Sequence, residues 1–110
     1  MDFLKYAKEN EKEFFEDLDT LMRIESTRDL STKEKNAPFG KGPRKALDAM
    51  LHMAERDGFR TEDVDGYAGI VTYGDQPETL GILGHLDIVP IGQDWTKEPL
   101  KVTLNDGYAF

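Results

Sequence analysis

The sequence contains no cysteine, only two histidines and a single tryptophan among 110 residues. The lack of cysteine excludes a disulfide framework, a cysteine-based zinc site, an iron–sulfur cluster and a cysteine nucleophile. No stretch approaches the roughly 18 apolar residues that a membrane-spanning helix needs. The first residues also lack the apolar run typical of a signal peptide. We therefore expect a cytoplasmic protein.

Basic residues are also few, with 14 Lys and Arg against 22 Asp and Glu, which gives a formal net charge of −8. A negative surface repels phosphate backbones and anionic lipid headgroups. We therefore expect no nucleic-acid partner and no membrane attachment. The length predicts one small domain, and the sequence leaves the oligomeric state open.

Two stretches have the spacing of amphipathic helices. Residues 2–24 carry apolar side chains three and four positions apart, and residues 43–57 repeat the pattern between Pro43, suited to the first helical position, and Gly58, suited to a left-handed cap. The stripe expected to be buried in the second helix consists of Ala46, Leu47, Met50, Leu51 and Ala54. Residues 25–42 are rich in turn formers, and loops of this length are often functional or mobile.

Strand patterns begin at residue 59. Residues 59–64 and 67–73 predict two strands, and residues 80–89 form a nearly continuous apolar run typical of a strand buried on both faces. Residues 105–107, Asn-Asp-Gly, predict a hairpin turn between two further short strands. The fold class predicted is therefore α/β, two helices followed by four or five strands, with the 43–57 helix packed on a sheet that contains residues 80–89.

The last predicted strand begins at Tyr108, two residues before the end of the sequence. Natural domains rarely stop within an element, so we expect residues 1–110 to be part of a longer polypeptide. The isolated chain should then be marginally stable and should expose an unpaired strand edge.

The two histidines have different settings. His52 lies beside the apolar stripe of the second predicted helix, and we expect a partly exposed helix histidine there. His85 lies in the most apolar run, where an ionisable group is costly to bury. Asp87 follows two residues later, so the alternation of a strand places both side chains on one face. A carboxylate in that place can orient the imidazole or influence a metal bound to it, although His-x-Asp alone is a weak motif.

Other candidate residues carry less information. Trp95 can border a substrate cleft or pack in a core, and the glycines at 40 and 42 lack the remainder of a phosphate-binding loop. Ser26 and Ser31 have no histidine near them in the sequence, so the sequence does not support a serine nucleophile.

The setting of His85 resembles a known family. Residues 84–90, Gly-His-Leu-Asp-Ile-Val-Pro, followed by Trp95 and Pro99, are similar to the signature of the di-zinc aminoacylase and dipeptidase family. That family includes acetylornithine deacetylase, succinyl-diaminopimelate desuccinylase and dipeptidase V. Residues 38–43, Pro-Phe-Gly-Lys-Gly-Pro, and an N-terminal helix that runs into residues 24–26 resemble the dipeptidase V branch. The resemblance extends from about residue 15 to residue 110.

The resemblance implies that residues 1–110 are the N-terminal portion of a three-layer αβα zinc-peptidase-like catalytic domain. His85 matches the family's first zinc ligand, and Asp87 matches the supporting aspartate that is treated as catalytic. In the family two zinc ions per site, or other divalent metals, activate the water that attacks the amide carbon. The implied function is hydrolysis of dipeptides, with a small peptide as the substrate.

The sequence departs from the family pattern at Glu25, where proline is usual, and at Leu100, where phenylalanine is frequent. The family's bridging aspartate, glutamate pair and other ligands lie outside these residues, so we expect the full-length protein to be the enzyme and this chain alone to be inactive. An N-acyl-amino-acid deacylase of the same family is one alternative. A non-catalytic acidic α/β interaction module is another, and the reading frame after Phe110 distinguishes it from the enzyme.

Overall fold

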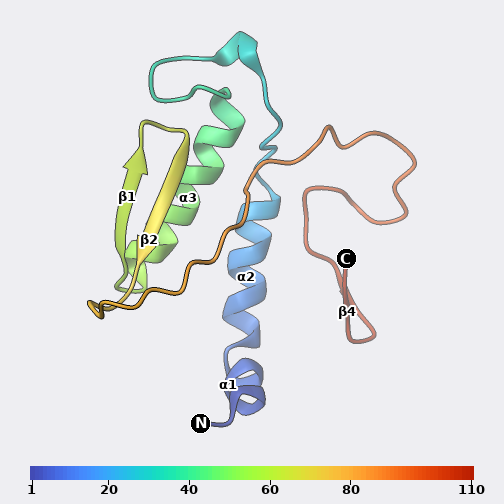
Figure 1. Ribbon diagram of the computed structural model, residues 1–110. Helices are drawn as coiled ribbons and strands as arrows, with labels where there is room; N and C mark the ends of the chain where they lie inside the picture. The colour runs from blue at the N-terminus through green and yellow to red at the C-terminus, as the bar shows by residue number, and fades with distance from the viewer. The chain divides into compact units, whose positions relative to one another are not determined.

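The computed structural model describes residues 1–110 and contains three α-helices, one short 3-10 helix and four short strands in two antiparallel hairpins (Figure 1). The chain divides into two units, one formed by residues 1–24 and 91–110 and the other by residues 25–90. This is a small α/β arrangement, as the sequence predicts, with one more helix than expected because the first helix is divided. No helix combines the length and the apolar character that crossing a membrane requires.

The N-terminal helical region of the first unit has a break at Asn10. Helix α1 spans Phe3–Glu9 and α2 spans Glu11–Met22. The Asn10 backbone leaves helical geometry at φ −106° and ψ 5°, and its side-chain amide donates to the Tyr6 carbonyl at 2.8 Å. The Tyr6 carbonyl also accepts from the Asn10 backbone N–H at 3.1 Å, so the side chain and the backbone of Asn10 share one acceptor. The single helix predicted over residues 2–24 is replaced by two.

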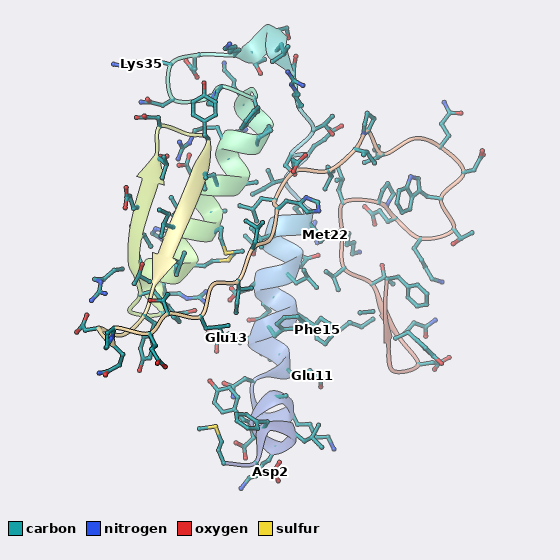
Figure 2. The ribbon with its side chains drawn as sticks, viewed as in Figure 1. Asp2, Glu11, Glu13, Phe15, Met22 and Lys35 are labelled. Carbon is teal, nitrogen blue, oxygen red and sulfur yellow. The ribbon has the colours of Figure 1, made fainter.

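The C-terminal hairpin of the same unit agrees with the sequence prediction. Strands β3 (Leu104–Asn105) and β4 (Tyr108–Ala109) pair antiparallel around Asp106 and Gly107, which both have positive φ. Positive φ at both central residues defines the turn type that Asp-Gly favours. Helix α2 contacts this region through the Asp19 carboxylate, which accepts from the Val102 N–H at 2.9 Å. Phe15 projects from the same helix (Figure 2).

Helix α3 (Lys41–Arg56) organises the second unit. The stripe predicted from the sequence is confirmed, because four of its five members are buried: Ala46, Leu47, Leu51 and Ala54. Gly58 has φ +86° and ends the helix with two reverse bonds, from its own N–H to Glu55 and from the Phe59 N–H to Ala54. These bonds satisfy carbonyls that the helix end would otherwise leave unpaired.

The buried face of α3 packs on the hairpin formed by β1 (Arg60–Val64) and β2 (Ala68–Thr72). Gly69 lies at the closest approach, where an added Cβ would lie only 2.8 Å from the side chains of Leu47 and Leu51. Arg44 of α3 forms an ion pair with Asp63 of β1 at 2.7 Å. Helix and hairpin are therefore held by both apolar packing and charge.

Residues 80–89 contradict the prediction of a strand buried on both faces. The segment is extended, but it joins no sheet, and its backbone pairing is one isolated parallel bridge between Ile88 and Thr27. Ile82 is 91% exposed and Leu83 is 100% exposed. A strand buried on both faces requires neighbours along its edges and a layer on each side, and residues 1–110 fold without supplying them. The helix therefore packs on a sheet that lacks this segment.

The long segment 25–42 is tied to its surroundings at several points. It contains a 3-10 turn, Leu30–Thr32, capped by the Asp29 carboxylate. Thr32 Oγ1 accepts from the Lys41 N–H at 2.9 Å, where α3 begins. Ala37 and Ser26 are each only 2% exposed. The segment is therefore held by several hydrogen bonds and by two buried residues.

Candidate metal-binding and catalytic site

The two residues singled out in the sequence lie against each other. The carboxylate oxygen Oδ1 of Asp87 lies 3.1 Å from Nδ1 of His85, and the Asp87 carbonyl oxygen lies 2.9 Å from the same nitrogen. The prediction that both side chains share a face is confirmed by exposure, because His85 and Asp87 are exposed whereas Leu86 and Ile88 are partly covered. With Nδ1 facing oxygen acceptors, the proton is favoured there and the lone pair is left on Nε2.

The pair is open to solvent. The side chains of His85 and Asp87 are 82% and 66% exposed. The expectation that His85 lies in a buried strand is therefore wrong for this chain. The reason is that residues 80–89 join no sheet and have no layer packed on each face. This exposure leaves the His85 ring accessible from solvent.

The backbone of the pair is anchored from a distant part of the chain. Ser26 donates its hydroxyl to the Leu86 carbonyl at 2.7 Å, across 60 residues of sequence. The Ile88 N–H faces the Ser26 carbonyl at 3.5 Å, beside the parallel bridge of Thr27 with Ile88. The sequence alone does not reveal this contact of Ser26 with Leu86, because the two residues that it joins lie 60 positions apart. The Ser26 hydroxyl is buried and bonded to a carbonyl, so a nucleophilic role stays unsupported.

An apolar cavity of about 620 Å³ lies beside the pair. One wall is the segment 83–87, and the other walls come from α3 and β2 through Leu47, Met50 and Val71 among others. Arg28 also lines the cavity. The outer edge of β2 has no hydrogen-bonded neighbour, because β1 is its single partner. The cavity is therefore bounded by two extended stretches, β2 and residues 83–87. No strand is paired with the outer edge of β2, and residues 83–87 belong to no sheet.

The donors present fit part of a zinc site. An imidazole with a free Nε2 and a carboxylate on Nδ1 is the arrangement that orients histidine ligands of zinc. Catalytic zinc needs about three protein ligands, and no group of three or more histidine, aspartate or glutamate side chains is placed to hold a metal. The chain thus supplies one candidate ligand and its orienting carboxylate.

The remaining candidates have no part in this arrangement. His52 is exposed on α3, as expected of a helix histidine without a special role. Trp95 is 57% exposed and donates its indole N–H to the Ile91 carbonyl at 2.6 Å. It is therefore not packed in a core.

The chain is similar to proteins named as dipeptidases. It is 39% identical over 106 residues to the "Beta-Ala-Xaa dipeptidase" of Lactobacillus delbrueckii subsp. lactis, which covers 96% of this chain and 23% of the relative. It is 46% identical over 98 residues to a "Putative dipeptidase" of Staphylococcus epidermidis, which covers 89% of this chain and 21% of the relative. A "Putative dipeptidase" of Staphylococcus haemolyticus is 43% identical over 100 residues.

The chain spans between a fifth and a quarter of the length of these relatives. No family model matches it. Over nearly its whole length, the chain is therefore 39–46% identical to part of proteins named as dipeptidases.

Proposed function

We propose that this chain is part of a zinc-dependent dipeptidase and supplies one zinc ligand, His85, together with the carboxylate that orients it, Asp87. The observation that carries the proposal is the 3.1 Å contact between Asp87 Oδ1 and His85 Nδ1. It is supported by the similarity of the chain to relatives named as dipeptidases. Those names also favour dipeptides over N-acyl amino acids as the substrate class.

The chemistry assigned to the two residues follows from the contact. Asp87 holds the proton on Nδ1 of His85 and fixes the ring orientation, so the Nε2 lone pair is available to a cation. Bound zinc would lower the pKa of a water molecule and polarise the amide carbonyl. Both side chains project from one face of an extended segment, so neither needs to rearrange to meet a ligand from solvent.

We assign the remaining ligands and the general base to the rest of a longer polypeptide. The relatives are more than four times as long as the aligned stretch, and one imidazole cannot hold catalytic zinc. The same polypeptide would cover Leu83 and fill the cavity between β2 and residues 83–87, because apolar side chains and free strand edges gain from being covered.

The test is hydrolysis of dipeptides by the full-length protein, with and without a chelator, together with zinc content. We expect a chelator to stop turnover and His85→Ala to nearly abolish both turnover and zinc binding. Asp87→Ala should weaken zinc affinity or activity about 10- to 100-fold, as expected for a partner that orients a ligand. The 110-residue chain should show no peptidase activity.

His52→Ala is the matched control, because it removes the other imidazole from an exposed position on α3. It should leave hydrolysis and zinc content at wild-type values. Chelator-insensitive hydrolysis, or full activity in His85→Ala, would contradict the proposal.

A further inference from the structure

Ser26 is the buried polar side chain of this structure, with 2% of its surface exposed. A buried hydroxyl needs a hydrogen-bond partner. The partner here is the carbonyl oxygen of Leu86, the residue between His85 and Asp87, at 2.7 Å. The Ser26 hydroxyl is therefore bonded to the peptide group between Leu86 and Asp87, within the stretch that carries both candidate site residues.

This bond restricts the geometry of the pair. The Leu86 carbonyl belongs to the peptide plane between Leu86 and Asp87, and rotation of that plane changes the direction of the Asp87 side chain relative to His85. The Ser26 carbonyl faces the Ile88 N–H at 3.5 Å, beyond Asp87 on the other side. Ser26 thus contacts the backbone on both sides of Asp87, through its hydroxyl and through its own carbonyl.

Ser26 is itself held by helix α3. A Cβ on Gly42, in the first turn of that helix, would overlap the Glu25 carbonyl oxygen and would lie 3.3 Å from Cα of Ser26. The backbone of residues 25–26 therefore rests directly on the helix, and glycine at position 42 is what permits the approach. Contacts run in sequence from α3 to Ser26 and from Ser26 to the Leu86 peptide.

We propose that Ser26 is a positioning residue for the His85–Asp87 pair. The proposal rests on the proposed function and deepens it. In this role Ser26 touches neither substrate nor zinc. Its hydroxyl fixes the Leu86 peptide, and this keeps the Asp87 carboxylate in contact with Nδ1 of His85 and keeps the orientation of the imidazole ring constant. Losing the hydroxyl should misalign the ligand and leave substrate contacts unchanged.

The test uses Ser26→Ala in the full-length protein. Loss of a partner that orients a metal ligand costs about 10- to 100-fold, and Ser26 acts one step further away. We therefore expect about a tenfold weaker zinc affinity by chelator competition, about a tenfold lower kcat, and a KM within about twofold of wild type. Backbone amides of residues 85–88 should exchange faster with solvent in the zinc-free protein.

Thr32→Ala is the matched control. It removes a hydroxyl that donates to the Asp29 carbonyl at 3.1 Å and accepts from the Lys41 N–H at 2.9 Å, in the same unit of the chain. It therefore disturbs the start of α3 but leaves the Ser26 hydroxyl and its bond to Leu86 in place. We expect it to lower the melting temperature as Ser26→Ala does while leaving zinc affinity and kcat unchanged. A second variant, Gly42→Ala, keeps the Ser26 hydroxyl but displaces the backbone of residues 25–26, and it should weaken zinc affinity in the same direction.

The outcomes separate the two proposals. If His85→Ala loses zinc and activity while Ser26→Ala and Gly42→Ala keep both within about twofold, the positioning role is overturned and the proposed function stands. If His85→Ala keeps zinc and activity, the proposed function itself fails. If Ser26→Ala loses zinc affinity and kcat while Thr32→Ala keeps them, the result supports both the positioning role and the proposed function.

Discussion

Helix α3 with its hairpin and the segment 80–89 are both rich in apolar residues, and they lie in the same unit of the chain. Leu47 and Leu51 of the helix are 8% and 9% exposed, whereas Ile82 and Leu83 of the segment are 91% and 100% exposed. The helix forms the hydrogen bonds of its backbone within itself, so its apolar face needs only one covering surface. The hairpin that follows it in the sequence provides that surface. An extended segment needs neighbours at its edges as well as a cover on each face. An apolar stretch can therefore be buried, but whether it is buried depends on which other segments pack against it.

The difference also explains where the candidate site lies. His85 and Asp87 project from the uncovered segment, and their anchor, Ser26, rests on the packed helix. An exposed pair on a segment that joins no sheet gains fixed geometry from contacts with a packed element. The site thus combines accessibility from one region with rigidity from the other.

The largest expected effect concerns the uncovered segment. In the 110-residue chain Leu83→Asp changes a fully exposed side chain, so the free energy of unfolding should change by no more than about 0.5 kcal/mol. In the full-length protein, where we propose that Leu83 is covered, a buried carboxylate should cost more than about 4 kcal/mol. Urea unfolding of both lengths measures this. A full-length variant as stable as wild type would show that the segment is a true surface.

A smaller effect is expected in the packed region. Leu47→Ala removes a side chain that contacts the hairpin at Gly69, and leucine truncations in cores cost about 2–5 kcal/mol. Leu83→Ala in the same 110-residue chain makes the same chemical change at an exposed position and should cost less than about 0.5 kcal/mol. Equal shifts of the urea midpoint in the two variants would contradict the contrast between the regions.

The two regions also differ in how far sequence could predict them. The start of α3 differs from the prediction, because the helix begins at Lys41 and Pro43 is its third residue rather than its first. The buried stripe of α3 and the turn at Gly58 follow from local rules, because glycine and apolar spacing act over one or two turns. The shared face of His85 and Asp87 follows from the alternation of an extended chain. The stripe, the turn and the shared face are confirmed.

Features that depend on distant residues could not be predicted. The cover of residues 80–89 depends on which segments pair with it, and the bond from Ser26 to Leu86 joins residues 60 positions apart. The break at Asn10 is local, but there the side chain and the backbone of Asn10 both bond to the Tyr6 carbonyl. Periodicity alone does not resolve such a competition.

The smallest effect concerns the charges of the packed region. Asp63 accepts from the Gly66 N–H at 2.7 Å and pairs with Arg44, and these two contacts, in that order of size, lower the pKa of its carboxyl. A carboxyl whose pKa is lower in the folded state stabilises the fold above its unfolded pKa of about 3.9, and this stabilisation disappears as the pH falls through the folded pKa. Asp63→Asn should therefore be less stable than wild type above about pH 5, and the difference should shrink below about pH 4.

Urea unfolding of the 110-residue chain between about pH 2.5 and pH 7 measures the difference. Asp75→Asn is the control, because Asp75 also pairs with an arginine, Arg60, at 2.8 Å, but their side chains are 82% and 64% exposed. Ion pairs at such exposure contribute little, so this variant should follow the wild type across the range. Arg44 is 17% exposed, and its pairing with Asp63 should therefore matter more. If the two variants lose the same stability, charge contributes no more to the packed region than to an exposed loop, and apolar packing alone separates helix α3 and its hairpin from residues 80–89.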